Sequence, residues 1–304
     1  MKLLRRLLAL PLLAALMAGP LAAAPLDATP RIAVLSAFEP EWTALRAVTQ
    51  ESTVHGEKGV SSITGTLEGK PVVLVLTGIS MVNAAMTTQM ALDRFNVTRI
   101  VLSGVAGGVD PSLAIGDVVV PDQWAEYLEA IFARKTPQGF ELPPGVKTDL
   151  PNFGMIHPRG VRVFREGQAG APRQFWFPVD PAMMAVARTA ASGIALKNCP
   201  ADGVCLTHVP KVVVGGNGVS GAAFVDNAEF RTFAFDAFKA QVLDMESAAV
   251  AHVAATNGVP YIVMRSLSDL AGGGPGANEI RIFEQLAAQN AVTVLRAFIK
   301  ALPN

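Results

Sequence analysis

The chain has 304 residues, of which 51% are hydrophobic and 16% are charged, and its 25 basic residues balance 25 acidic ones. A composition this apolar is typical of a compact globular protein and excludes a disordered chain. Because the net charge is zero and basic residues form a run only at the extreme N-terminus, no nucleic-acid partner is expected.

The first 24 residues have the pattern of a secretory signal peptide. Lys2, Arg5 and Arg6 carry positive charge, residues 7–18 form an apolar stretch, and small residues follow up to Ala24. This stretch is too short to span a membrane, and an uncleaved signal anchor is the alternative. We therefore expect a periplasmic or secreted protein whose mature part has no stable membrane association.

Apolar runs alternate with helical patterns from residue 30 onward. Strands are expected at residues 31–37, 71–76, 99–102, 117–121, 211–214 and 261–264. Helices are expected at residues 42–48, 82–95, 181–192 and 278–302, with a further helix between the last two that ends at Asn257. This alternation predicts a single domain of the three-layer α/β class over residues 30–304.

Two stretches of this domain are expected to be loops. Residues 103–108 are small and would let a ligand approach the backbone closely, but they do not form the G-x-G-x-x-G fingerprint of a dinucleotide site. Residues 126–180 are rich in proline, glycine and aromatic residues and have no clear helix or strand pattern. Long loops in compact domains are often functional, so we expect this segment to shape a ligand pocket.

The stretch 241–274 places three acidic residues at the junctions of a strand, a helix and a second strand. Asp244 and Ser247 are suited to cap the helix, and Glu246 falls in its first turn, where the helix dipole favours a carboxylate. Asp269 follows an apolar strand, and burial there would raise its pKa and suit a proton donor. Two carboxyl groups in such different environments can divide the roles of acid and anion, although plain capping also explains all three residues.

The two cysteines, Cys199 and Cys205, flank a short turn that contains proline and glycine. In an exported protein such a pair predicts a local disulfide. A metal site is not expected, because one cysteine pair without a neighbouring histidine does not supply a tetrahedral ligand set. The four histidines show no ligand spacing either.

Four segments of the chain resemble the nucleoside phosphorylase/hydrolase superfamily, and within it the 5′-methylthioadenosine/S-adenosylhomocysteine nucleosidases. They are the opening strand and acidic turn at residues 32–41, the glycine turn and helix start at 77–85, the small-residue stretch 103–108 with 115–119, and the stretch 242–269. The resemblance implies a central mixed sheet between helical layers, a homodimer, and no cofactor or metal. It also implies a small purine nucleoside as substrate.

The resemblance implies three catalytic residues. Glu41 would activate the attacking water, with Arg265 nearby to orient it, and Asp269 would protonate the purine at N7. An N-glycosidic bond breaks through an oxocarbenium-like state, which needs a proton on the leaving base, a nucleophile on the opposite face and negative charge near the ribose. Glu41, Glu246 and Asp269 would supply these three needs without a cofactor.

The other implied site residues bind the substrate or orient the acid. Those that bind it are Glu246 and Met245 at the ribose, Phe224 and Val225 at the base, and Ala106 and Gly107 on the small-residue stretch. Ser268 would orient Asp269. Phe224 would stack on the base, although a lone phenylalanine in an apolar stretch is more often a core residue.

Two positions depart from the family pattern. Val105 stands where these nucleosidases usually have serine, and Ala222 stands where they usually have aspartate. The resemblance therefore implies neither the identity of the substrate, including its 5′ substituent, nor the catalytic efficiency. A phosphorylase of the same fold and a non-catalytic nucleoside-binding protein are the alternatives. Related phosphorylases have an arginine in the first turn, where this chain carries Glu39 and Glu41. Acidic side chains there would repel phosphate, so hydrolysis is favoured.

Overall fold

The computed structural model describes residues 26–57, 59–148, 150–165, 167, 170–201 and 203–303. The predicted signal peptide lies outside these described residues. Within them, no helix is both long and apolar enough to cross a membrane.

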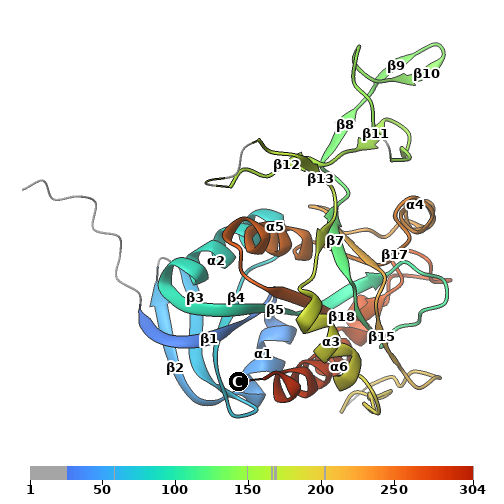
Figure 1. Ribbon diagram of the computed structural model, residues 1–304. Coiled ribbons are helices and arrows are strands. Elements are labelled where there is room, and N and C mark those ends of the chain that lie inside the picture. The colour runs from blue at the N-terminus through green and yellow to red at the C-terminus, as the bar shows by residue number, and fades with distance from the viewer. Residues whose placement is uncertain are drawn as a thin grey trace, which may run out of the picture.

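A mixed β-sheet forms the middle layer of the molecule (Figure 1). In the described part of the chain its strands are β1 (Asp27–Ser36), β2 (Gln50–Glu57), β3 (Val60–Leu67), β4 (Lys70–Leu76), β5 (Phe95–Gly108), β6 (Val118–Val120), β7 (Gln123–Glu126), β14 (Phe177–Pro178), β15 (Val212–Val214), β16 (Asn217–Ser220), β17 (Ala240–Asp244) and β18 (Tyr261–Asp269). The helices are α1 (Glu39–Val48), α2 (Met81–Arg94), α3 (Pro181–Ala190), α4 (Ala228–Phe238), α5 (Ser247–Asn257) and α6 (Ile280–Ala301).

Helices cover both faces of this sheet. Helices α2 and α5 pack together on one face, whereas α1 and α3 pack against α6 on the other (Figure 1). The sequence of α6 explains its position, because Leu286, Leu295 and Phe298 recur at helical spacing and are buried, while Arg281 and Gln285 are exposed. The predicted three-layer α/β/α architecture with a central mixed sheet is confirmed.

Strand β5 is the central strand that positions the site. It pairs in parallel with β1 on one side and with β18 on the other, and its last two residues pair antiparallel with β17. Every residue of β18 is buried, as expected of an apolar strand with helices on both faces of the sheet. Because β1, β4 and β18 run parallel, their carboxyl ends meet at one edge, where ligands bind in open α/β sheets.

The predicted elements differ from the observed ones at several places. Residues 103–108 continue strand β5 and do not form a loop. Strand β18 extends as far as Asp269, so the polar residues expected after this strand belong to it. The strands β2, β3, β7 and β16 and the helix α4 were not predicted; residues 50–67, which form β2 and β3, carry too few apolar side chains to show a clear period.

The described residues of 127–176 form an arm that leaves the sheet after β7 and returns to it at β14. Figure 1 shows this arm projecting away from the helical layers. Short strand pairs form within it: β8 (Ala130–Phe132) with β11 (Ile156–Pro158), β9 (Arg134–Thr136) with β10 (Gly139–Glu141), and β12 (Val161–Arg162) with β13 (Arg173–Gln174). Paired strands therefore replace part of the predicted loop.

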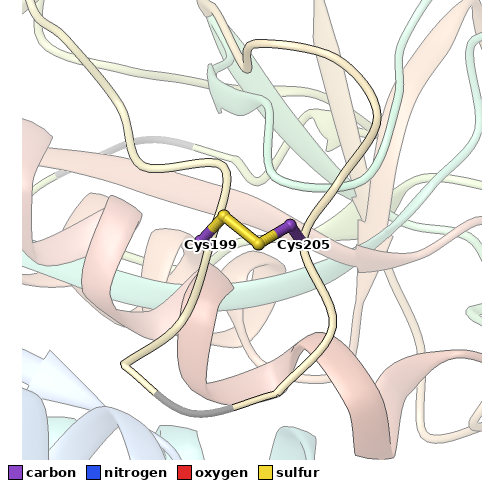
Figure 2. Close-up of a disulfide and its surroundings, with 2 residues drawn as sticks. All are labelled: Cys199 and Cys205. Atoms are coloured by element: carbon purple, nitrogen blue, oxygen red, sulfur yellow. A yellow bond between two sulfur atoms is a disulfide. The ribbon is translucent and has the colours of Figure 1, made fainter.

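Cys199 and Cys205 form the predicted disulfide in the connection between α3 and β15 (Figure 2). The ring of His208 lies just beyond this bridge and hydrogen-bonds to the carbonyl group of Ile115 at 2.9 Å. Among the described residues, no group of three or more histidine, cysteine, aspartate or glutamate side chains is arranged to hold a metal ion.

Candidate active site

A cavity opens at the carboxyl ends of the central strands. Its lining consists of Ala37, Phe38, Glu41, Ile79, Val105, Ala106, Gly107, Ala223, Phe224, Val225, Leu243, Asp244, Met245, Glu246, Ser268, Asp269 and Ile280. Every predicted site residue except Arg265 belongs to this lining, and Arg265 contacts Glu41 and Glu246. No described residue of the arm belongs to it, so the expectation that residues 126–180 shape the pocket is wrong for the single chain.

Glu41 reaches the cavity from the first turn of α1. Its Oε2 accepts hydrogen bonds from the backbone N–H groups of Ala37 at 2.6 Å and Phe38 at 3.4 Å, and its Oε1 accepts one from Val105 at 2.8 Å. An acidic side chain in the first turn that bonds back to the preceding backbone satisfies N–H groups which the helix leaves unpaired. Burial raises the pKa of Glu41, whereas Arg265 and the three N–H groups act to lower it.

Arg265 is fully buried and faces three carboxylates. Its Nε lies 2.6 Å from Asp244 Oδ2, its Nη2 3.2 Å from Glu246 Oε2, and its Nη1 3.7 Å from Glu41 Oε1. Burial alone would lower the pKa of the guanidinium, but the three carboxylates outweigh burial and raise it, so the group stays charged. Within the described part of the chain Nη1 forms no hydrogen bond, which leaves a donor available beside Glu41.

Gly104 explains why these side chains can lie over strand β5. It is the residue opposite Arg265 in the pairing of β5 with β18. A Cβ atom at Gly104 would lie 2.2 Å from Glu41 Oε1 and 2.4 Å from Arg265 Nη1, far inside van der Waals contact. The small residues of 103–108 were expected to admit a ligand, but at this position glycine admits the charged side chains of the protein itself.

Asp244 is a site residue that the sequence identified only as a helix cap. Its Oδ1 does accept the backbone N–H groups of Glu246 at 3.2 Å and Ser247 at 3.1 Å. It also accepts hydroxyl hydrogen bonds from Ser220, at 2.5 Å, and from Ser247, and it holds Arg265 through Oδ2. The capping interpretation was therefore incomplete, because this carboxylate also fixes the arginine that faces Glu41 and Glu246.

Glu246 lines the cavity between Arg265 and the start of α2. Its Oε1 accepts a hydrogen bond from the backbone N–H of Ser80 at 2.8 Å. Ser80 has φ of 85°, a conformation that residues with a Cβ rarely adopt, and this strained turn directs its N–H at the carboxylate. Burial raises the pKa of Glu246 to about 7, with Arg265 acting in the opposite direction.

Asp269 ends strand β18 and is buried, as predicted. Its Oδ1 accepts hydrogen bonds from the backbone N–H of Ala271 at 2.8 Å and from Asn278 Nδ2 at 3.3 Å. Its Oδ2 accepts one from the hydroxyl group of Ser268 at 3.0 Å. All three donors are neutral, and burial raises the pKa of Asp269. This environment favours the neutral acid, the form that can donate a proton.

Apolar side chains cover much of the remaining lining. Phe224 is 56% exposed, so its interpretation as a core residue is wrong, and its ring is available to a planar ligand. Ile79, Val105 and Ile280 add further apolar surface. Among the residues that the structure describes, the lining contains four carboxyl groups and no lysine or arginine. This combination suits a neutral, partly apolar ligand and disfavours an anion.

Comparison with known proteins identifies relatives over nearly the whole chain. A 5′-methylthioadenosine/S-adenosylhomocysteine nucleosidase from Mycobacterium bovis is 26% identical over 268 residues, which cover 87% of this chain and 95% of that protein. Bark storage protein A from Populus deltoides is 29% identical over 253 residues, which cover 79% of this chain and 77% of that protein.

One of the similar solved structures is the 5′-methylthioadenosine/S-adenosylhomocysteine nucleosidase from Neisseria meningitidis in complex with methylthio-immucillin-A. It matches with a TM-score of 0.66 and 24% identity, over 90% of this chain and 99% of that one, and at this identity the likeness supports the fold alone. The family profile described as Phosphorylase superfamily matches residues 31–300, from the first strand to the last helix. The chain therefore belongs to the phosphorylase superfamily.

Proposed function

We propose that this protein hydrolyses the N-glycosidic bond of adenine-type nucleosides or thionucleosides and releases the free purine base. One observation carries the proposal. A single cavity is lined by Glu41, which faces a buried cation, and by Asp269, which receives only neutral donors. Such a pair can supply an activated water and a proton donor for one bond cleavage. The relatives named as nucleosidases support the same reaction.

In the proposed reaction a water bound between Glu41 and Arg265 Nη1 attacks the ribose C1′ atom. Glu41 accepts a proton from this water. The bond between C1′ and N9 breaks, and its electron pair moves onto the purine, which takes the proton of Asp269 at N7. Glu246 accepts a hydrogen bond from the ribose 2′-hydroxyl, and its charge stabilises the oxocarbenium-like transition state. The products are a free base and a free sugar.

The charges of the lining argue against the phosphorylase alternative. Phosphate would have to enter beside Glu41 and Glu246, while Arg265 is already surrounded by three carboxylates. A phosphate anion placed next to these carboxylates in a buried site would be strongly repelled by them. Water carries no such penalty, so hydrolysis is the reaction that the lining accommodates.

A second candidate function is nucleoside binding without catalysis. The similarity to bark storage protein A, at 29% identity, supports this second candidate. Fold membership alone does not decide between the two, because one fold can host enzymes and binding proteins. The buried Glu41–Arg265 pair and the three neutral hydrogen-bond donors on Asp269 favour the enzyme.

Base release from purified protein tests the proposal. Methylthioadenosine, S-adenosylhomocysteine, adenosine and inosine are incubated with the protein, with and without phosphate, beside the Asp269→Asn variant. Adenine release that needs no phosphate and is lost in the variant is the expected result. Release only with phosphate would replace hydrolysis by phosphorolysis, and binding without release would identify a binding protein.

We further propose that the protein is exported and forms homodimers. The N-terminal pattern and the Cys199–Cys205 disulfide support export, because disulfides persist in oxidising compartments. On α2, beside the cavity residue Ile79, the side chains of Val82 and Met86 are exposed, which supports an apolar contact between two copies. N-terminal sequencing of the periplasmic protein tests export, and a full-length cytoplasmic chain would contradict it. Light scattering tests the homodimer, and a monomer mass would contradict it.

A further inference from the structure

Two loops meet at one corner of the cavity. Residues 221–227, which we call the base loop, carry Phe224 and Val225, and residues 270–279, which we call the acid loop, follow Asp269. The backbone N–H of Asn227 donates to the carbonyl group of Ala271 at 3.1 Å. Gly272, with φ of +84°, approaches so closely that a Cβ atom there would lie 2.3 Å from the Asn227 nitrogen. The two loops are therefore fixed to each other.

Asn278 of the acid loop bridges two carboxylates at this corner. Its Nδ2 donates to Asp269 Oδ1 at 3.3 Å and to Asp226 Oδ1 of the base loop at 3.1 Å. Its own Oδ1 accepts the backbone N–H of Ile280 at 3.0 Å. Since an N–H group can only donate, this third contact assigns the amide orientation, and the NH₂ group must face the two carboxylates.

These contacts determine which oxygen of Asp269 can carry a proton. Oδ1 receives a backbone N–H from Ala271 and an amide N–H from Asn278, and both groups can only donate. A proton on Oδ1 would therefore face two hydrogen-bond donors, neither of which can accept it. Oδ2 faces the hydroxyl group of Ser268, which can either donate or accept. The neutral acid is thus compatible with its contacts only when its proton is on Oδ2.

We propose that Asn278, anchored by Asp226, is a positioning residue that keeps Asp269 Oδ1 as an acceptor and so places the transferable proton on Oδ2. This inference rests on the proposed role of Asp269 as proton donor. The charged groups that face this corner are Asp226 of the base loop, Glu279 of the acid loop and Arg231 of α4, whose Nε donates to the carbonyl group of Gly108 at 2.9 Å.

The first test compares two leaving groups in the variant Asn278→Ala. With an adenine nucleoside we expect kcat to fall roughly tenfold with little change in KM, because one hydrogen bond to the acid is lost while the acid stays in place. With a p-nitrophenyl riboside of the same 5′ substituent, whose leaving group departs without protonation, the rate should stay unchanged. Equal losses on both substrates, or no loss on the nucleoside, would overturn the proposal.

The control is Asn152→Ala, which removes an exposed amide that donates to the Gly154 carbonyl group in the arm. It should leave both rates unchanged. Asp226→Ala should lower the nucleoside rate in the wild-type background and add nothing in the Asn278→Ala background, because the anchor acts only through the amide. Additive losses of rate in the double variant would mean that Asp226 does not act through Asn278.

A second measurement does not depend on catalysis. The titration of Asp269 is followed by infrared difference spectra between each protein and its Asp269→Asn counterpart. The hydrogen bond from Asn278 acts to lower the pKa of Asp269, so Asn278→Ala should shift the titration to higher pH. An unchanged titration would overturn the inference about Asn278, whether or not the protein is active. Inactivity on every nucleoside would instead overturn the proposed function.

Discussion

The two ends of the cavity hold their carboxyl groups in different ways. At the arginine end, Glu41, Asp244 and Glu246 surround the buried guanidinium of Arg265. At the asparagine end, Asp269 is held by a hydroxyl, a backbone N–H and the amide of Asn278. At the first end the carboxylates contact a cation, and at the second end the hydrogen bonds to Asp269 come from neutral donors.

This difference separates the roles of the acids. Burial raises the pKa of Glu41, Glu246 and Asp269 alike, but Arg265 opposes the shift only for the first two. A group that must accept a proton benefits from a nearby cation, whereas a group that must donate one benefits from its absence. The proposed general base, Glu41, therefore lies at the end where a cation favours its charged form. The proposed general acid, Asp269, lies at the end where burial raises its pKa and so favours its uncharged form.

The largest effect is expected from removing the cation. Arg265→Met removes the cation that faces three buried carboxylates. Breaking a buried ion pair in this way typically costs about 3–5 kcal/mol of unfolding free energy. Activity should be lost as well. Urea denaturation and base release measure the two effects.

Arg296→Met is the matched control at the protein surface. The Nε of Arg296 lies 2.6 Å from Glu68 Oε1, but its side chain is 51% exposed. Exposed pairs contribute about 1 kcal/mol or less, so this variant should stay close to the wild type. Equal destabilisation by the two substitutions would mean that the buried cluster stabilises the fold no more than an exposed ion pair does.

A smaller effect on stability but a large one on activity is expected from Gly104→Ala. The added Cβ would displace Glu41 or Arg265, and misplacing a reacting group by about 1 Å can cost on the order of 100-fold in rate. The control is Gly56→Ala in β2, where a Cβ meets no atom within 4 Å. Normal activity in Gly104→Ala would show that the close approach of these side chains over β5 is not needed.

The smallest effect concerns the pH dependence of stability. The folded-state pKa of Glu246 is raised from 4.5 to about 7, so between these values the folded protein binds a proton that the unfolded chain has lost. The unfolding free energy should therefore fall as pH rises from 4.5 to about 7. Glu246→Gln should make this decline shallower without abolishing it, because Glu41 and Asp269 have shifts of the same sign. Urea denaturation across this pH range would disprove the assignment if both proteins gave the same slope.

The sequence predicted which residues meet at the cavity better than it predicted the contacts between them. Apolar periodicity identified the buried strands and the amphipathic helix α6, and the family resemblance identified residues that line one cavity. Local patterns did not predict that Gly104 makes room for Glu41, or that Asn278 contacts Asp226 across 52 residues of sequence, because both depend on tertiary contacts. For the same reason Asp244 was identified as a cap and not as the partner of Arg265.

The division of roles between the two ends of the cavity is tested by comparing Asp269→Asn with Glu41→Gln on two substrates. These are an adenine nucleoside and the p-nitrophenyl riboside with the same 5′ substituent. General acid catalysis typically contributes about 100-fold to 10,000-fold, so Asp269→Asn should lose that much on the nucleoside and little on the riboside. Glu41→Gln should be impaired on both, because each reaction needs the activated water. Equal losses of the two variants on both substrates would contradict the division of roles between the two ends of the cavity.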